Sequence, residues 1–243
     1  PYTNGTYVTT VGNDRSQEEN FKFFFTANFN KRLNIGADYE AINSRGYYTN
    51  LASRDKIAHF FTNFLGERYE AHARFSIHRF ENYENGGITN DDYITKPLEM
   101  SGGYREYESL NIPVALSNTF NLTKYNDLFV NHKYHLGFHR KDTTTGDTLE
   151  VFVPVSSIIH TFHWDTGRKL YDSKTANLPY YDNVANISNK LTADSVSLMT
   201  LRNTLGLSLN EGFHPWMKFG LTAYAEHEYR RYGSISDVKL PLD

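Results

Sequence analysis

Charged and histidine side chains recur at alternate positions in several stretches of this sequence, and these are the residues whose spacing could support chemistry. Successive side chains of an extended chain point to opposite sides, so each stretch would present its charges on one surface. Groups of both signs on one surface could contact hydrophilic solutes, or they could pair with one another across strands. The candidates are Lys22, Asp38, Glu40, His72, Arg74, His78, Lys133, His135, Arg202, Lys218, Glu226 and Glu228.

Metal binding and the common catalytic motifs are not indicated. His135 and His139 lie about 13 Å apart at the rise of a strand, too far to share one metal ion. The chain contains no Cys, which excludes disulfides, thiolate metal sites and thiol catalysis. It also contains no G-x-S-x-G, phosphate-loop, H-E-x-x-H or dinucleotide motif. We therefore expect no metal, no cofactor and no enzymatic activity.

The element that positions the first candidates is a predicted β-hairpin over residues 21–42. In its first strand Phe21, Phe23, Phe25, Ala27 and Phe29 share one face, opposite a polar face that only Phe24 interrupts. A turn at residues 30–32 follows, and the second strand then alternates in the same way from Leu33 to Ala41. Such alternation is typical of strands with one apolar and one polar face.

Eight further strands are predicted along the chain. They cover residues 55–66, 69–78, 110–122, 130–139, 149–153, 157–171, 199–210 and 217–228, and the two faces of 55–66 are mixed. Short connections are predicted near Lys31, Glu67, Lys124 and Gly212, and long polar ones after the second, fourth and eighth strands. Aromatic residues gather near the short turns (Phe29, Tyr69, Phe120, Tyr125, Phe213 and Trp216) and near the long loops (Tyr47, Tyr48, Tyr107, Tyr171 and Tyr232).

Two all-β architectures could accommodate this alternation. A soluble sandwich buries the apolar face against a second sheet, whereas a membrane barrel turns it toward lipid and lines its lumen with the polar face. Several of the predicted strands exceed ten residues, close to the 9 to 11 or so that a tilted membrane strand needs. Aromatic residues make up 15% of the chain and hydrophobic residues only 39%, which suits a thin apolar band with aromatic edges. The pattern favours an antiparallel up-and-down transmembrane β-barrel.

The 243 residues are expected to form one domain or barrel fragment over 1–243, beginning and ending in loops around Asn4-Gly5 and Pro241-Leu242. The net charge of −3 gives no reason to expect a nucleic-acid partner.

Three segments resemble the putative porins of Bacteroidota outer membranes. They are the hairpin Phe21 to Ile42, Tyr104-Arg105-Glu106-Tyr107 leading into Asn111-Ile112-Pro113-Val114, and the run from Val153-Pro154 to His160-Thr161. The resemblance implies an outer-membrane barrel, larger than the ten strands predicted here, that passes small hydrophilic solutes by passive diffusion. Outer-membrane lipid would be its surroundings.

Other functions remain open alongside the channel. The chain could be a non-conducting barrel that serves as a scaffold for other outer-membrane proteins, or a homo-oligomer. Two further alternatives are a soluble carbohydrate-binding β-sandwich and a lipid-facing hydrolase that combines Ser157 with His160 or His163.

Overall fold

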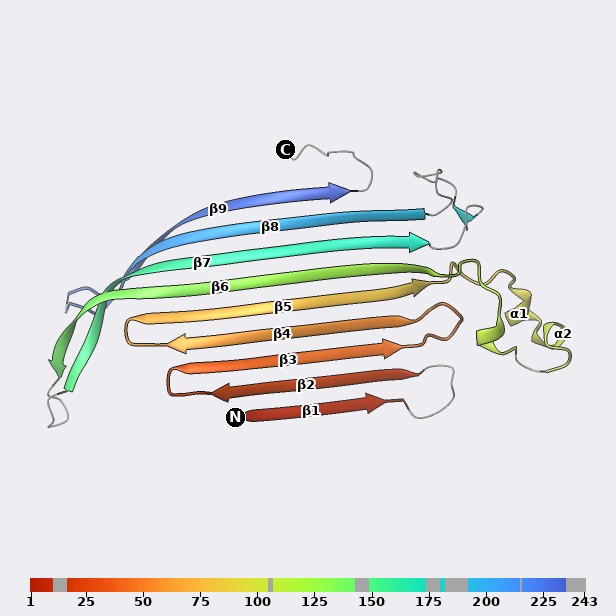
Figure 1. Ribbon diagram of the computed structural model, residues 1–243, viewed down its shortest axis with the longest axis horizontal. Helices are drawn as coiled ribbons and strands as arrows, with labels where there is room; N and C mark the ends of the chain where they lie inside the picture. The colour runs from red at the N-terminus through yellow and green to blue at the C-terminus, as the bar shows by residue number, and fades with distance from the viewer. Residues whose placement is uncertain are drawn as a thin grey trace.

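The fold is taken from a computed structural model that describes residues 1–10, 17–104, 107–142, 149–173, 180–181, 192–214 and 216–234. Within these residues the dominant element is one antiparallel sheet of nine strands (Figure 1). The strands pair in strict sequence order, each with its neighbours along the chain. They are β1 (Tyr2–Thr9), β2 (Glu18–Asn28), β3 (Leu33–Ser44), β4 (Ser53–Leu65), β5 (Tyr69–Glu84), β6 (Thr119–Asp142), β7 (Leu149–Ser173), β8 (Thr192–Leu209) and β9 (Leu221–Ser234). This is the all-β, antiparallel, up-and-down arrangement that the sequence predicts.

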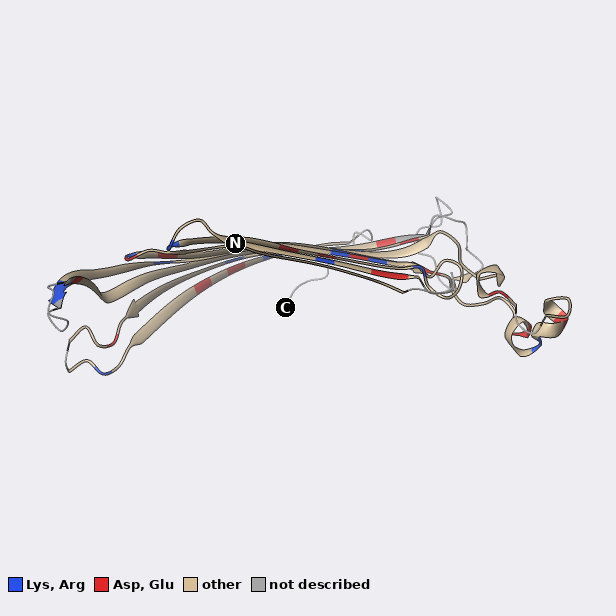
Figure 2. Ribbon diagram, turned by 90° about the horizontal axis from the view of Figure 1, so that it is seen from below, with Lys and Arg blue, Asp and Glu red and all other residues tan. Residues whose placement is uncertain are grey.

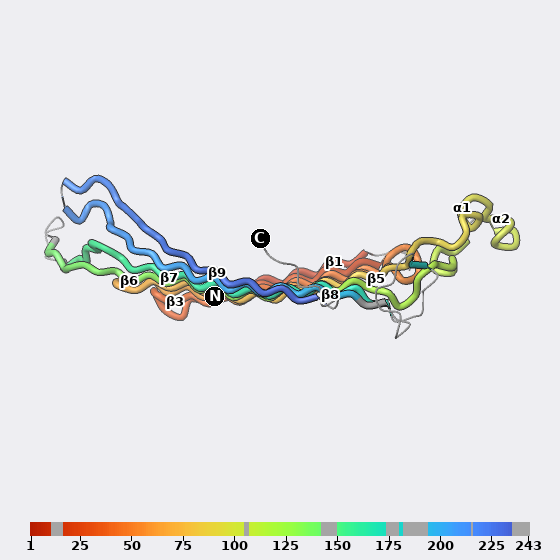
Figure 3. The backbone as a smooth tube through the Cα atoms, turned by 90° about the horizontal axis from the view of Figure 1, so that it is seen from above, coloured from red at the N-terminus to blue at the C-terminus, as the bar shows by residue number. Residues whose placement is uncertain are grey.

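The sheet is a single layer. Seen nearly edge-on, the strands form one thin curved wall, with no second sheet stacked against it (Figures 2 and 3). Among the described residues, the apolar side chains that are buried are Ile112, Leu116 and Met217, and none of these lies in a strand. Phe23, Leu205 and Phe219 are exposed. The described residues therefore do not form the two-layer core of the sandwich alternative.

The register places apolar side chains on one face of the sheet, which we call the apolar face. One row of paired residues runs from Phe25 of β2 to Tyr229 of β9, and directly paired residues point to the same side. Between these ends the row holds Ala37, Phe60, Phe75, Leu128, Trp164 and Leu201. The register also settles the mixed faces of β4, because Ala58, Phe60, Thr62 and Phe64 share the apolar face.

The apolar band crosses the strands obliquely. On β2 it extends beyond the row of Phe25 toward the long-loop end, through Phe23 to Phe21. On β9 the band begins at Tyr229 and continues toward the turn end to Leu221, with Arg231 as the next outward position on this face. A band that lies level in a membrane would cross the strands in this way if they are tilted, as barrel strands are.

The two ends of the sheet differ. At one end β2 and β3 are joined by residues 29–32, and β4 and β5 by 66–68. At the other end the connection between β5 and β6 spans 85–118 and contains α1 (Asp92–Thr95), α2 (Pro97–Met100) and the 3₁₀ helix η2 (Ser109–Asn111). This connection packs on the β3–β4 loop, where Asn85 Nδ2 donates to the carbonyl of Thr49 and Asn50 Nδ2 to that of Leu116. Within the described residues, no helix combines the length and apolarity required for a membrane span.

Several sequence-predicted boundaries are wrong. The predicted strands 110–122 and 130–139 belong to a single strand, β6, which begins only at Thr119 and runs straight through the predicted turn at Lys124. Phe120 and Tyr125 consequently lie at the long-loop end rather than beside a short turn. Residues 2–9, expected to be a loop, form β1.

Pro154 does not end a strand either, because 149–153 and 157–171 are both parts of β7. Gly137 of β6 pairs with Pro154, whereas the preceding Leu136 pairs with Ser156. Val155 is thus an extra residue, and β7 accommodates the proline at this bulge. Pro241 and Leu242, the expected terminal loop, lie outside the described residues.

Candidate functional surface: the polar face of the sheet

The face opposite the apolar band, which we call the polar face, carries almost all of the sequence-predicted candidates. Eleven of the twelve lie there by register, distributed over β2, β3, β5, β6, β8 and β9. The exception is Lys218, which was predicted to lie in a strand but lies in the connection before β9. The alternation of the sequence thus brings candidates far apart in the chain onto one continuous surface.

Asp127 of β6 is the most enclosed charge on this surface, with 2% of its area exposed. Arg74 Nη2 of β5 donates to Asp127 Oδ1 at 2.9 Å, and His163 Nε2 of β7 lies 2.5 Å from Asp127 Oδ2. Ser76 Oγ donates to Oδ1 at 3.4 Å. The buried carboxylate of Asp127 thus links the side chains of β5, β6 and β7 in the middle of the sheet.

A second charged cluster joins β8 to β9. Arg202 directs both Nε and Nη2 at Glu228 Oε2, at 2.8 and 2.6 Å, and its Nε lies 3.4 Å from Glu226 Oε1. Arg230 also forms an ion pair with Glu228. Among the predicted candidates, Arg202 therefore contacts both Glu226 and Glu228, and Thr204 donates a further hydrogen bond to Glu226.

The remaining pairs of the polar face lie nearer the first strands. Lys22 Nζ lies 2.8 Å from Glu40 Oε1, and Asp38 Oδ2 lies 2.6 Å from His59 Nδ1. Phe24, which interrupts the polar alternation of its strand, stacks on Phe61 with ring centroids 6.2 Å apart. Its position on the polar face is thereby explained by an aromatic contact across β3.

Ser157, His135 and Glu70 form a hydrogen-bonded chain on the polar face. His135 Nδ1 lies 2.9 Å from Ser157 Oγ, and His135 Nε2 lies 3.1 Å from Glu70 Oε1. Ser157 is only 1% exposed and lies in a regular stretch of β7, so a substrate carbonyl could not reach its hydroxyl in this arrangement. These hydrogen bonds are better explained as cross-strand pairing than as a nucleophilic site.

The hydrolase alternative finds no support in the positions of its residues. Ser157 pairs with His135, whereas His160 lies on the apolar face and contacts His132, with 2.8 Å between their ring nitrogens. His163 shares the face of Ser157 but contacts Asp127. In the described part of the chain, no group of three or more His, Asp or Glu residues is arranged to hold a metal ion.

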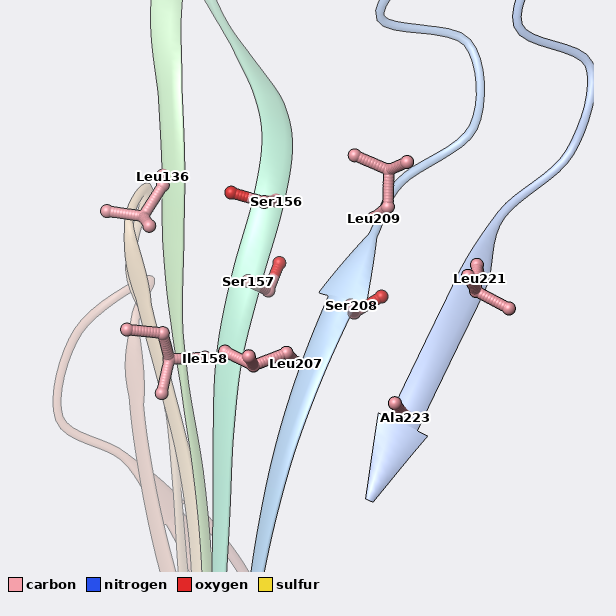
Figure 4. Close-up of a pocket in the computed structure, with 9 residues that line it drawn as sticks. All are labelled: Leu136, Ser156, Ser157, Ile158, Leu207, Ser208, Leu209, Leu221 and Ala223. Atoms are coloured by element: carbon pink, nitrogen blue, oxygen red, sulfur yellow. The ribbon is translucent and has the colours of Figure 1, made fainter. Parts of the chain in front are cut away.

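A shallow hollow on the apolar face lies near the turn end of β6 to β9 (Figure 4). Leucine, isoleucine, alanine and serine side chains line it, and none of its lining residues is charged. Six of the nine residues labelled in Figure 4 are leucine, isoleucine or alanine and the other three are serine, so the hollow offers mainly hydrocarbon contacts.

The sequence argument missed Asp127, His163 and Glu70 as members of the charged network. All three follow the same alternation as the named candidates, on strands β5 to β7. Asp127 was missed because residues 123–126 were assigned to a turn, which left its facing undefined. The alternation of β6 around Leu128 and Val130 could have placed it.

Comparison with known proteins gives one match. A family model described as "Putative porin" matches residues 1–240, almost the whole chain. No curated protein and no solved structure matched. A wall of long antiparallel strands with one apolar and one charged face agrees with that match. The chain belongs to the putative porin family, whose description indicates a porin-like β-protein of the outer membrane.

Proposed function

We propose that this chain forms the wall of an outer-membrane channel through which small hydrophilic solutes diffuse passively. The observation that carries the proposal is the separation of the two faces, with exposed apolar side chains on one and paired charges of both signs on the other. In lipid the apolar face would contact acyl chains and the polar face would line the lumen. A lining of both signs suits weak selectivity, and it requires neither a cofactor nor a catalytic step.

In a membrane barrel the two outer edges of this sheet would have to be paired. The outer edges of β1 and β9 lie on opposite sides of the sheet, and no pairing joins them in the described residues (Figure 1). In a bilayer each unpaired backbone group costs several kcal/mol, so membrane strands occur in closed barrels. We propose that further strands, from this protein or from a second copy, complete the barrel.

The test is conductance of the purified full-length protein in planar lipid bilayers. We expect stepwise ion currents, and a shift toward anions when Glu226→Lys reverses one charge of the polar face. Glu99→Lys in the loop helix α2 makes the same charge change away from the wall and should leave selectivity nearly unchanged. A protein that stays soluble and monomeric without detergent would refute the proposal. A folded membrane protein that carries no current and co-purifies with other outer-membrane proteins would support the scaffold alternative instead.

A further inference from the structure

Four basic side chains stand in direct register on four neighbouring strands of the apolar face. Lys56 of β4 is the Cα partner of Arg79 of β5. Arg79 is in turn the partner of Lys124 of β6, which is the partner of Arg168 of β7. All four side chains are exposed. We call these four residues the basic row.

Like charges placed directly opposite one another destabilise a sheet. On the polar face this cost is offset where cations contact carboxylates, as Arg74 does at Asp127 and Arg202 at Glu228. In the basic row Arg79 has such a partner, Glu81 Oε2 at 2.8 Å. Lys56, Lys124 and Arg168 have none among the residues that the structure describes. The row therefore carries positive charge that the described wall does not neutralise.

The row lies at one edge of the apolar band. Toward the turns, the next side chains on this face are Ala58 of β4 and Ile77 of β5, which belong to the band. On β6 and β7 the polar pair Asn126 and Thr166 comes first, and Leu128 and Trp164 follow. The row thus lies between the apolar band and the long-loop end of the strands, where this face also carries the paired Leu122 and Leu170. The headgroups of one leaflet would lie at that end.

We propose that the basic row binds phosphate groups of lipid headgroups in the leaflet at the long-loop end. This inference rests on the proposed function, because it requires the apolar face to contact lipid. Lys56 and Lys124 can lay their methylene stems along the band while their ammonium groups reach the headgroups. Arg168 can present a planar pair of donors to a phosphate. At the usual strand spacing the row extends about 14 Å, enough to contact more than one phosphate group.

The experiment measures lipid binding by the folded full-length protein in uncharged detergent, using native mass spectrometry. The probe is phosphatidic acid, and diacylglycerol with the same acyl chains serves as its phosphate-free counterpart. The test variant is Lys56→Gln/Lys124→Gln/Arg168→Gln. The matched control, Lys31→Gln/Lys141→Gln/Lys218→Gln, removes three positive charges from the turn end of the sheet.

We expect the wild type to prefer phosphatidic acid to diacylglycerol, and the test variant to lose about tenfold or more in affinity for phosphatidic acid. The affinity of the control variant for phosphatidic acid should stay within about twofold of that of the wild type. Equal binding by the test variant and the wild type would overturn the inference. Displacement of the lipid by millimolar inorganic phosphate would also overturn it, since the site would then take soluble phosphate.

Two measurements keep this test separate from the proposed function. Migration on unheated gels reports whether the barrel is folded, and a protein that needs no detergent would contradict the proposed function itself. In uncharged detergent without lipid, the test variant should be at least as resistant to unfolding as the wild type, because it relieves repulsion within the row. A test variant that is folded and requires detergent but binds phosphatidic acid as well as the wild type would refute only the lipid-binding role of the basic row, and not the proposed function.

Discussion

Replacing Arg74 by Gln should destabilise the wall more than replacing its partner Asp127 by Asn. The Asp127 side chain is 3% exposed and that of Arg74 is 56% exposed. Arg74→Gln therefore leaves a buried carboxylate with one cation fewer, whereas after Asp127→Asn the exposed guanidinium can return to water. The full cost of breaking a buried ion pair, roughly 3 to 5 kcal/mol, is an upper limit here because one partner is solvated.

We expect Arg74→Gln to lower the free energy of unfolding by about 2 kcal/mol, the value of a hydrogen bond to a charged group. Asp127→Asn should cost about 1 kcal/mol, since the amide can still accept from Ser76. The double variant should cost less than the sum of the two, by about 1 kcal/mol or more, because it removes the unpaired carboxylate together with its partner.

The measurement is urea unfolding of the full-length barrel in detergent micelles, followed by tryptophan fluorescence and completed as a double-mutant cycle. Lys22→Gln is the matched control, because its pair with Glu40 is 55% and 28% exposed and should contribute less than about 1 kcal/mol. If Arg74→Gln behaves like Lys22→Gln and the cycle shows no coupling, the account of Asp127 as a buried junction is wrong.

Two further pairs of substitutions test the packing of the faces. A Cβ atom at Gly36 would lie 2.2 Å from Cζ of Phe61, so Gly36→Val should destabilise the protein by about 1 to 3 kcal/mol, and Phe61→Ala in the same chain should recover part of the loss in urea unfolding. In a lipid bilayer, Leu205→Lys on the apolar face should lower the free energy of unfolding by about 2 to 4 kcal/mol, whereas Thr204→Lys on the polar face should lower it by less than about 1 kcal/mol. Equal losses in vesicle-based unfolding would contradict the assignment of the apolar face to lipid.

The alternation of the sequence was sufficient to assign the faces wherever the apolar band is continuous. The hairpin of β2 and β3 was predicted within a few residues. Apolar and polar residues alternate from Phe21 to Ala27 and from Leu33 to Ala41, and Phe24 is the single exception. The polar face follows from the same period, which is why eleven of the candidates share it. These features depend on local periodicity alone.

Strand ends could not be predicted in the same way. Outside the band the alternation of apolar and polar residues is interrupted, so residues 123–126 have the composition of a turn although they are paired with β5 and β7. Pro154 is accommodated within β7 because of a bulge near its partner Gly137, and this bulge is visible only in the register of the two strands. Asn4 and Gly5 suggest a turn, yet pairing with Phe24 and Phe23 keeps them in β1. In each case tertiary pairing overrides the local signal.

The strict sequence order of the strands also has a consequence for assembly. Each of the eight pairings joins neighbours along the chain, so the sheet can grow by adding one strand after another. The loops that must close range from residues 29–32 to the long connection 85–118, and the entropy of closing a loop grows only slowly with its length. Local contacts of this kind favour fast folding. The slow step should be the joining of the two outer edges, which has to bring β1 to a strand far from it in sequence. A mutation in the middle strands should therefore mainly speed unfolding, while a mutation at either edge should delay the appearance of the heat-resistant form.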